Sequence, residues 1–397
     1  MSAGPSRPGR RLGVYVDTAY EQAEGGLAAD PVDASFLLFV LEVGRHFDGV
    51  VLFGRLAPEA DGEGRFVPLP TDAALVALPH YPDLRRLGAV ARAAAGTIRA
   101  FWRALDDVDV VWAFGPHPFA LTLVALARLR AKRVALGVRQ DSIGYFRSRL
   151  PGRAWKPLLG GVYVLDVAFR LLARRFPTAV VGEEIARRYG GGPTVAPMAV
   201  SLVRAADVVA TPPAKDWGGT VELLTVGRLE PEKNPLLLVE ALARLERLRP
   251  GRYRLTWLGS GRLREAVRGR ADALGIGPLV ELPGHVPFGA GLLERYRAAH
   301  VFVHVSLTEG VPQVLLEALA AGTAVVATDV GGVASALDRG RAGLLVPPAD
   351  ADALADAITR IDDDETLRGR LVARGLELAR LRTLERESER VAAHLGG

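Results

Sequence analysis

The sequence has no cysteine and only 7 histidines in 397 residues. Without cysteine, the chain can form no disulfides, thiolate metal sites, iron–sulfur clusters or cysteine nucleophiles. So few histidines also argue against a dedicated metal cage. Because a chain without cysteine fits a reducing compartment, we expect a cytoplasmic protein, and leave open a peripheral position at the inner face of the membrane.

Long uninterrupted apolar runs are absent too. The two most apolar stretches, 110–127 and 158–172, are broken by Pro116 and Pro118 or by Asp166. Neither offers the roughly 18 clean apolar residues that a membrane-spanning helix needs. What the chain does have is a 49 % hydrophobic composition, enough to fill the cores of two or three domains of about 150 residues each.

The net charge of +5 is concentrated in one region. Between Arg128 and Arg188 there are 14 basic residues and 4 acidic ones. This region fits contact with an anionic membrane surface, and equally a solvated surface. We expect no nucleic-acid partner, because no RNA- or DNA-reading motif accompanies the charge.

Short apolar runs typical of strands alternate with amphipathic segments along the whole chain. The predicted strands are 13–17, 49–53, 108–114, 133–138, 179–181, 222–226, 254–258, 280–282, 301–305 and 324–328. This alternation predicts an α/β protein with parallel sheets covered by helices on both faces. Glycine and proline interrupt it at 190–220, so we expect two doubly wound domains that bind ligands in a cleft at the carboxyl ends of their strands.

The loop that follows the strand 222–226 carries two cations, Arg228 and Lys233. Asn234 suits a helix N-cap and Pro235 the first helical position, so a helix is expected to start there. Arg228 and Lys233 together would suit a diphosphate. The alternative is a solvated loop whose charges have no common role.

A second loop, after the strand 301–305, carries Glu309 and leads into a helix at Pro312 that contains Glu317. The helix N-terminus favours phosphate, and the two carboxylates could accept hydrogen bonds from sugar or ribose hydroxyls. The alternative is that Glu309 only stabilises the helix dipole and that Glu317 is a surface acid.

Together these segments resemble the nucleotide-binding domain of the family 4 (group 1) retaining glycosyltransferases, which have the GT-B fold of two Rossmann-like domains facing a central cleft. The resemblance covers about residues 221–360 and includes Glu309 and Glu317 at the family's Glu, seven residues, Glu spacing. It rests on the stretches TVGRLEPEKN, LTWLGSGRLREAV, VELPGHVP, SLTEGVPQVLLEALAAGTAVVATDVGG and GLLVPPAD.

The resemblance implies an acceptor domain at 1–200, a linker at 201–218, a nucleotide-sugar domain at 219–376 and a helix at 377–397 that crosses back to the first domain. It implies that Arg228 and Lys233 hold the donor diphosphate, Glu309 the transferred sugar, and Glu317 the ribose. The donor site it implies comprises Arg228, Lys233, Gly284, His285, Val286, Glu309, Gly310, Val311 and Glu317.

The acceptor side matches the family less well. Gly25 and Gly26 stand in for the family's glycine loop after the first strand. At the end of the strand 133–138 this chain reads Gly137, Val138 and then Arg139, where many members have a histidine. His117, after the preceding strand, is therefore the substitute candidate. Arg139 and Asp141 are expected to orient the acceptor.

The reaction implied is retaining transfer of a sugar from a nucleoside diphosphate sugar to an acceptor hydroxyl by front-face attack, with Glu309, Arg228, Lys233 and His117 as the catalytic set. The acceptor is left open among a lipid-linked intermediate, a polysaccharide and a small molecule. No metal or other cofactor is expected, since two cations and a helix end can stabilise the leaving diphosphate. The alternatives are an epimerase-like enzyme of the same fold and a non-catalytic protein that binds a sugar nucleotide or an anionic membrane.

Two rival motifs are weaker. Gly259 and Gly261 imitate a dinucleotide fingerprint, but Arg264 stands where the third glycine belongs. Asp107 and Asp109 have the spacing of a metal-binding pair but precede the strand residues 110–114, at the wrong end of the sheet. Residues 362–364, three aspartates, are expected to be solvated.

Overall fold

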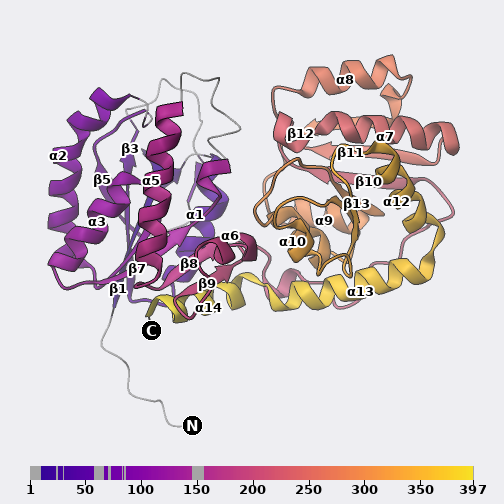
Figure 1. Ribbon diagram of the computed structural model, residues 1–397. Coiled ribbons are helices and arrows are strands. Elements are labelled where there is room, and N and C mark those ends of the chain that lie inside the picture. The colour runs from indigo at the N-terminus through magenta and orange to yellow at the C-terminus, as the bar shows by residue number, and fades with distance from the viewer. Residues whose placement is uncertain are drawn as a thin grey trace, which may run out of the picture. The chain divides into compact units, whose positions relative to one another are not determined.

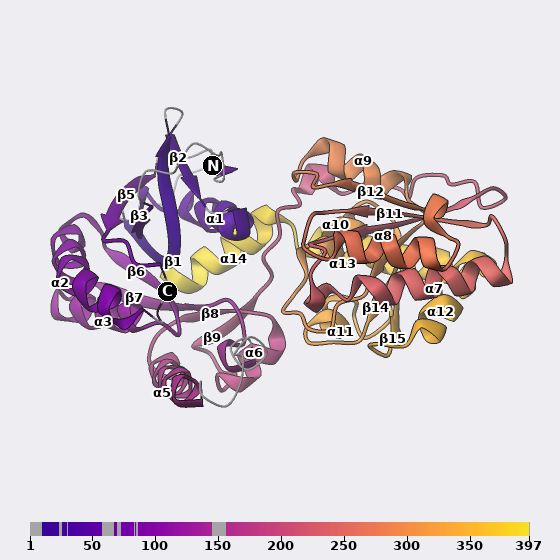
Figure 2. The same ribbon diagram turned by 90° about the horizontal axis from the view of Figure 1, so that it is seen from above.

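The computed structural model describes residues 10–23, 26–29, 31–57, 67–69, 73–82, 84, 86–144 and 156–396. The chain divides into two compact units (Figures 1 and 2). The first comprises Met1–Leu202 with Glu385–Gly397, and the second Val203–Leu384. Each is built on its own sheet of mainly parallel strands, which confirms the predicted pair of Rossmann-like domains.

The parallel strands of the first unit lie in the order β5-β3-β1-β6-β7-β8-β9. Two further strands, β2 and β4, extend the far end of β1 in antiparallel pairing. The strands are β1 (Arg11–Ala23), β2 (Gly26–Ala29), β3 (Gly49–Leu56), β4 (Val67–Pro68), β5 (Ala74–Leu78), β6 (Val110–Gly115), β7 (Arg133–Val138), β8 (Thr178–Val181) and β9 (Val195–Met198).

Helices cover both faces of this sheet, with α2 and α3 on one side and α1 on the other (Figure 2). Alternation along β6 explains the two layers, since Val111 and Ala113 join the core under α2 and α3 while Trp112 and Phe114 face α1. The helices are α1 (Pro31–Gly44), α2 (Leu87–Ala104), α3 (Pro118–Leu129), α5 (Lys156–Ala173) and α6 (Glu183–Arg188).

The second sheet has the strand order β12-β11-β10-β13-β14-β15, all parallel. Its strands are β10 (Val221–Val226), β11 (Tyr253–Leu258), β12 (Val280–Gly284), β13 (Val301–His304), β14 (Ala324–Thr328) and β15 (Leu344–Val346). The order reverses between β10 and β13, as it does between β1 and β6 in the first unit. Ligands bind at the carboxyl ends of strands beside such a switch point.

Two apolar layers sandwich the second sheet. One packs α7, α8 and α12 against Leu223, Leu255 and Trp257, and the other packs α9, α10 and α13 against Leu224 and Phe302. The helices are α7 (Pro235–Leu248), α8 (Arg264–Ala273), α9 (Ala290–Ala298), α10 (Gln313–Ala320), α11 (Val333–Ala336), α12 (Ala351–Asp363) and α13 (Glu365–Leu381).

The chain ends in α14 (Leu384–Gly396), which packs on the first unit. Glu387 accepts a hydrogen bond from the Ala199 amide at 3.1 Å, and His394 Nε2 lies 3.1 Å from the Thr194 carbonyl oxygen. The expected single helix over 377–397 is wrong in one respect: it breaks between α13 and α14, where the Leu384 amide donates a hydrogen bond to the Val203 carbonyl instead of to a helical partner.

Of the three aspartates at 362–364, Asp362 is buried, contrary to the sequence prediction, whereas Asp363 and Asp364 are exposed as predicted. The Asp362 side chain is 1 % exposed and accepts hydrogen bonds from Arg252 and from the Tyr253 hydroxyl, the latter at 2.8 Å. Burial raises the pKa of Asp362, but Arg252 and Tyr253 outweigh it and hold this pKa below its usual range. Asp364 caps α13 through the Leu367 amide. Asp362 therefore ties the end of α12 to the start of β11.

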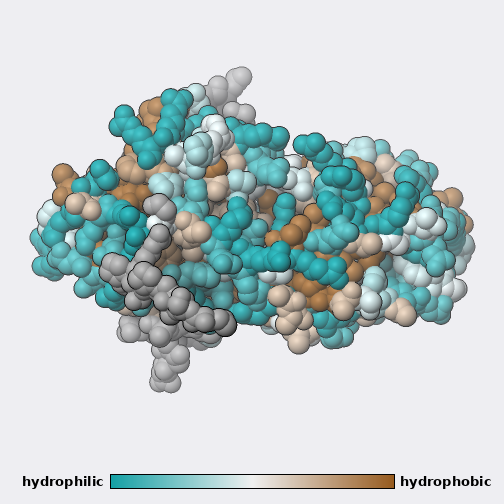
Figure 3. Space-filling model, turned by 90° about the horizontal axis from the view of Figure 1, so that it is seen from below, coloured by the Kyte–Doolittle hydropathy of each residue, from teal (hydrophilic) through white to brown (hydrophobic). Residues whose placement is uncertain are grey.

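Among the described residues, none of the helices is long and apolar enough to cross a bilayer. On the face that Figure 3 shows, hydrophilic side chains surround small hydrophobic patches.

Candidate donor site

Both cations of the predicted diphosphate loop lie between β10 and α7, beside the switch point of the second sheet. Asn234 is the N-cap residue of α7 and Pro235 its first residue, as predicted, although the Asn234 side chain makes no capping hydrogen bond. Arg228 is 52 % exposed and pairs with Glu232 at 2.8 Å. Lys233 is more enclosed and pairs with Glu309. The loop therefore presents one exposed guanidinium, that of Arg228, and one more enclosed ammonium, that of Lys233.

Glu309 lies in the loop after β13 and is held by three groups. The Lys233 ammonium pairs with its Oε1 atom, the Ser306 hydroxyl donates to the same atom at 2.6 Å, and His304 Nε2 lies 3.2 Å from it. Burial raises the pKa of Glu309, but His304 and Lys233 outweigh it and lower this pKa to about 2. Glu309 is therefore an ionised acceptor at neutral pH. The Leu307 amide also bonds the Glu232 carbonyl, which joins the two loops directly.

Glycines on neighbouring strand ends let these loops pack closely. A Cβ atom on Gly259 would lie 1.9 Å from the Gly227 carbonyl oxygen, and one on Gly331 would lie 2.0 Å from the Glu309 carbonyl oxygen. Gly331 also has a φ of 49°, which favours glycine. The glycines that imitate a dinucleotide fingerprint thus support the Arg228 loop, and Gly331 supports Glu309.

Glu317 faces inward from α10 rather than lying on the surface. It is 5 % exposed, and its Oε2 atom accepts a hydrogen bond from the Tyr296 hydroxyl of α9 at 2.7 Å. Burial raises the pKa of Glu317 to about 7, although the Tyr296 hydrogen bond opposes the shift. The alternative of an ordinary surface acid is therefore wrong.

The raised pKa of Glu317 predicts how stability changes with pH. The folded protein holds this proton up to about pH 7, whereas the unfolded chain releases it near 4.5, so the contribution of Glu317 to the free energy of unfolding falls between these values. The glutamine of Glu317→Gln does not titrate. We therefore expect the free energy of unfolding of this variant, taken relative to that of the wild type, to rise by about 3 kcal/mol between pH 4.5 and pH 8. Urea unfolding at several pH values measures this difference. A difference that stays constant with pH would contradict it.

The remaining predicted donor residues lie at the same edge of the second sheet. Gly284 ends β12, and its carbonyl accepts a hydrogen bond from the Gly259 amide at 2.8 Å. His285 is exposed, and Val286 packs partly against the core beneath α9. Gly310 and Val311 lie between Glu309 and the start of α10. The structure thus brings Lys233 and Glu309 into contact and leaves the base-binding role of 284–286 a prediction.

The first unit has its own polar cluster at the corresponding switch point. Asp17 accepts a hydrogen bond from the Tyr81 hydroxyl at 2.5 Å and lies 3.0 Å from Arg55 Nε and 3.2 Å from His117 Nε2. Burial raises the pKa of Asp17, but His117, Arg55 and Tyr81 outweigh it and hold this pKa well below its usual range. The other ring nitrogen of His117, Nδ1, lies 2.8 Å from the Tyr15 hydroxyl and caps α3. Both nitrogens are thus engaged, and Asp17, 25 % exposed, is the more accessible group.

The other acceptor candidates are placed differently from the prediction. The first strand continues to Ala23 instead of ending in a loop, because it forms a hairpin in which Gly26 starts β2 and pairs with Ala23. Gly25 lies outside the described residues. Arg139 pairs with Asp33 at 2.7 Å, and Asp141 pairs with Arg188 at 2.6 Å. These contacts lie within the first unit, and the acceptor roles of these residues stay predictions.

Sequence reasoning missed Asp17, Arg55, Tyr81 and His304. Asp17 ends the predicted strand 13–17, and His304 is the last residue but one of the predicted strand 301–305. A polar residue near the carboxyl end of a parallel strand is a signal that could have singled them out. Arg55 and Tyr81 offered no such signal, since the first lies beyond the predicted end of its strand and the second follows a strand that was not predicted.

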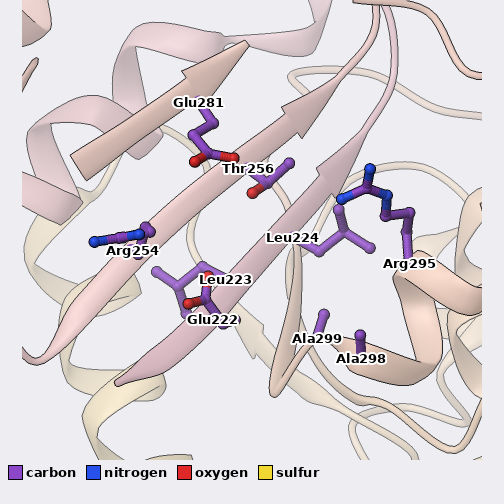
Figure 4. A pocket seen from close by; sticks show the side chains of 9 residues that line it. All are labelled: Glu222, Leu223, Leu224, Arg254, Thr256, Glu281, Arg295, Ala298 and Ala299. Atoms are coloured by element: carbon purple, nitrogen blue, oxygen red, sulfur yellow. The ribbon is translucent and has the colours of Figure 1, made fainter. Parts of the chain in front are cut away.

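Two hollows open away from the carboxyl ends of the strands. One, of about 240 Å³, lies against the start of β10 and the end of α9, with Glu222, Arg254, Glu281 and Arg295 among its lining side chains (Figure 4). The other, of about 500 Å³, includes Arg128, Arg133 and Arg175 and lies near the start of β7.

Within the described ranges, no three His, Asp or Glu side chains gather as a metal site requires. Asp109 lies just before the start of β6, as predicted, and its side chain accepts a hydrogen bond from the Arg11 amide.

The sequence of the second unit is similar to that of a known family. Residues 214–377 match the family described as Glycosyl transferases group 1. That range contains the Lys233–Glu309 contact and both switch-point loops of the second sheet. The match shows that the second unit is similar to this family.

Curated relatives agree with this group 1 match. The chain is 38 % identical over 219 residues to a D-inositol 3-phosphate glycosyltransferase of Pseudarthrobacter chlorophenolicus, covering 52 % of this chain and 50 % of that protein. It is 35 % identical over 276 residues to the protein of that name from Geodermatophilus obscurus, covering 66 % and 56 %. The chain thus spans about half the length of the curated relatives it matches.

Solved structures share the fold along nearly the whole chain. Sucrose-phosphate synthase of Thermosynechococcus elongatus has a TM-score of 0.68 and 18 % identity, covering 98 % of this chain and 97 % of that one. Anabaena Alr3699/HepE, solved in complex with UDP-glucose, has a TM-score of 0.65 and 16 % identity, covering 98 % and 99 %. The fold is therefore GT-B.

Proposed function

We propose that the protein is a retaining glycosyltransferase of the family 4 type that moves a sugar from a nucleoside diphosphate sugar to an acceptor hydroxyl. The observation that carries the proposal is the contact of Lys233 with Glu309 at the switch point of the second sheet, within the range that matches group 1. One loop supplies cations for a diphosphate, and the other supplies an ionised carboxylate for sugar hydroxyls. No observation favours the epimerase-like or non-catalytic alternatives.

The reaction forms and breaks bonds on one face of the sugar. The acceptor oxygen bonds to the anomeric carbon as the bond to the diphosphate oxygen breaks, and the acceptor proton passes to that leaving oxygen. Arg228, Lys233 and the N-terminus of α10 stabilise the charge that develops on the diphosphate, so we propose a reaction without a bound metal. Glu317 binds the ribose hydroxyls, and 284–286 line the base.

A UDP-linked donor is the first to test, because a solved protein of the same fold is in complex with UDP-glucose. The acceptor is proposed to bind the first unit, with Asp17 and His117 at the switch point of its sheet and Arg139 and Asp141 nearby. The curated relatives are named for an inositol phosphate acceptor, which makes a phosphorylated polyol the first acceptor to try.

The configuration of the released sugar tests the retaining mechanism even before the acceptor is known. With UDP-α-glucose and water as the acceptor, we expect proton NMR at early times to show α-glucose before mutarotation. Early β-glucose would contradict retention. The same spectra recorded with D-inositol 3-phosphate show whether a new α-glycosidic signal replaces that of free glucose.

We also propose that the basic region of the first unit contacts an anionic membrane surface. Arg174 and Arg175 are exposed at the end of α5, and Leu171 on that helix is 53 % exposed. Arg147, Arg149 and Arg153 lie outside the described residues. Binding to phosphatidylglycerol vesicles should weaken as salt rises. Equal binding to neutral phosphatidylcholine vesicles would contradict the proposal.

A further inference from the structure

A histidine is buried under the proposed donor site. His304 is the last residue of β13 and 3 % exposed, and the three residues before it in the strand are Val301, Phe302 and Val303. An apolar residue would fill this position without the cost of burying a polar ring. The Nε2 atom of His304 lies 3.2 Å from Glu309 Oε1. At that distance a nitrogen lone pair would repel the carboxylate, so Nε2 carries the hydrogen. Nε2 is buried and makes no hydrogen bond of regular geometry to any described residue, so its 3.2 Å approach to Oε1 is the polar contact this nitrogen has.

All three groups that hold Glu309 meet on one of its oxygens. Lys233, Ser306 and His304 each contact Oε1, while none of the described residues donates a hydrogen bond to Oε2. A carboxylate whose first oxygen is fixed in this way presents its second oxygen in a defined direction. Oε2 is therefore the atom left for a ligand hydroxyl.

Lys233 cannot serve two anions equally well. The proposed function assigns its ammonium to the donor diphosphate, and this draws it away from Glu309. Ser306 and His304 then remain to hold Oε1. Of the two, His304 comes from the end of a buried strand, whereas Ser306 belongs to the loop that follows it.

We propose that His304 is a positioning residue that fixes Glu309 Oε1, so that Oε2 receives a hydroxyl of the donor sugar. The proposal rests on the proposed function and deepens it. It implies that His304 affects recognition of the sugar and leaves recognition of the nucleoside diphosphate alone.

The test uses calorimetry to compare the affinity of each nucleoside diphosphate with that of its glucose conjugate. The pairs are UDP and UDP-glucose, GDP and GDP-glucose, and ADP and ADP-glucose. We expect His304→Leu to weaken binding of the preferred conjugate about tenfold, the equivalent of one hydrogen bond to a charged group, and to leave binding of its nucleoside diphosphate unchanged. His304→Gln keeps an N–H donor on the side chain and should recover most of the loss. The unchanged binding of the diphosphate also shows that the variant is folded.

His300→Leu is the matched control, since His300 is also buried and bonds the Glu222 amide, at the opposite end of β13. Equal loss for diphosphate and conjugate, no loss for either, or the same selective loss in His300→Leu would overturn the proposal. If the wild-type protein binds the diphosphates but gains nothing from the sugar, the positioning role fails while the nucleotide site stands. If it binds none of these compounds, the proposed function fails and this proposal with it.

Discussion

Replacing Lys233 with methionine is expected to lower the turnover number for sugar transfer by roughly 10²- to 10³-fold, the loss typical when a group that stabilises developing charge is removed. The methionine side chain keeps most of the length of lysine but lacks the ammonium that the proposed function places against the leaving diphosphate. It also leaves Glu309 with one cation fewer, so the pKa of that carboxyl should rise. Steady-state release of the nucleoside diphosphate measures the effect.

Lys132→Met is the matched control for this change. Lys132 lies in the first unit, just before the amino end of β7. We expect it to leave the turnover number unchanged. Equal losses in both variants, or full activity in Lys233→Met, would contradict the role assigned to Lys233.

Replacing Asp362 with alanine is expected to lower the free energy of unfolding of the second unit by about 3 kcal/mol, because it leaves charged partners without their carboxylate. Arg252 contacts Asp362 at 2.5 Å and Arg249 at 3.3 Å, and the Tyr253 hydroxyl loses its acceptor. Chemical denaturation followed by tryptophan fluorescence measures the change.

The neighbouring Asp363 provides the comparison. Its side chain is 54 % exposed and pairs with Arg249 at 2.7 Å, so Asp363→Ala should cost less than about 1 kcal/mol. If the two alanine variants were equally stable, Asp362 would not be the link between α12 and β11 that its burial indicates.

The fold and the donor loops could be predicted because their signals are local. Periodicity gave strands such as 133–138 and 324–328 with the bounds that the structure shows. The pair Asn234 and Pro235 marked the start of α7. The three charged residues of the donor site, Arg228, Lys233 and Glu309, each follow a strand, and parallel strands place such residues at one edge of the sheet.

What the sequence concealed depends on contacts between distant segments. Asp362 reads as one of three adjacent acids, and only the position of Arg252, 110 residues earlier, reveals that it is buried in an ion pair. His117 stood out as a histidine that follows a strand, but its contacts with Tyr15 and Asp17 join the loop after β6 to the distant strand β1. The hairpin of β1 and β2 removed the expected glycine loop because an antiparallel partner extended the strand.

The central claim, that the second unit binds a nucleoside diphosphate through Arg228 and Lys233, is tested most directly by thermal melting with UDP, GDP, ADP and CMP. At 100 times its dissociation constant, the correct nucleotide should stabilise the protein by about 2.7 kcal/mol, and Arg228→Ala and Lys233→Met should each reduce that gain. A melting temperature that none of the four nucleotides raises would contradict the claim.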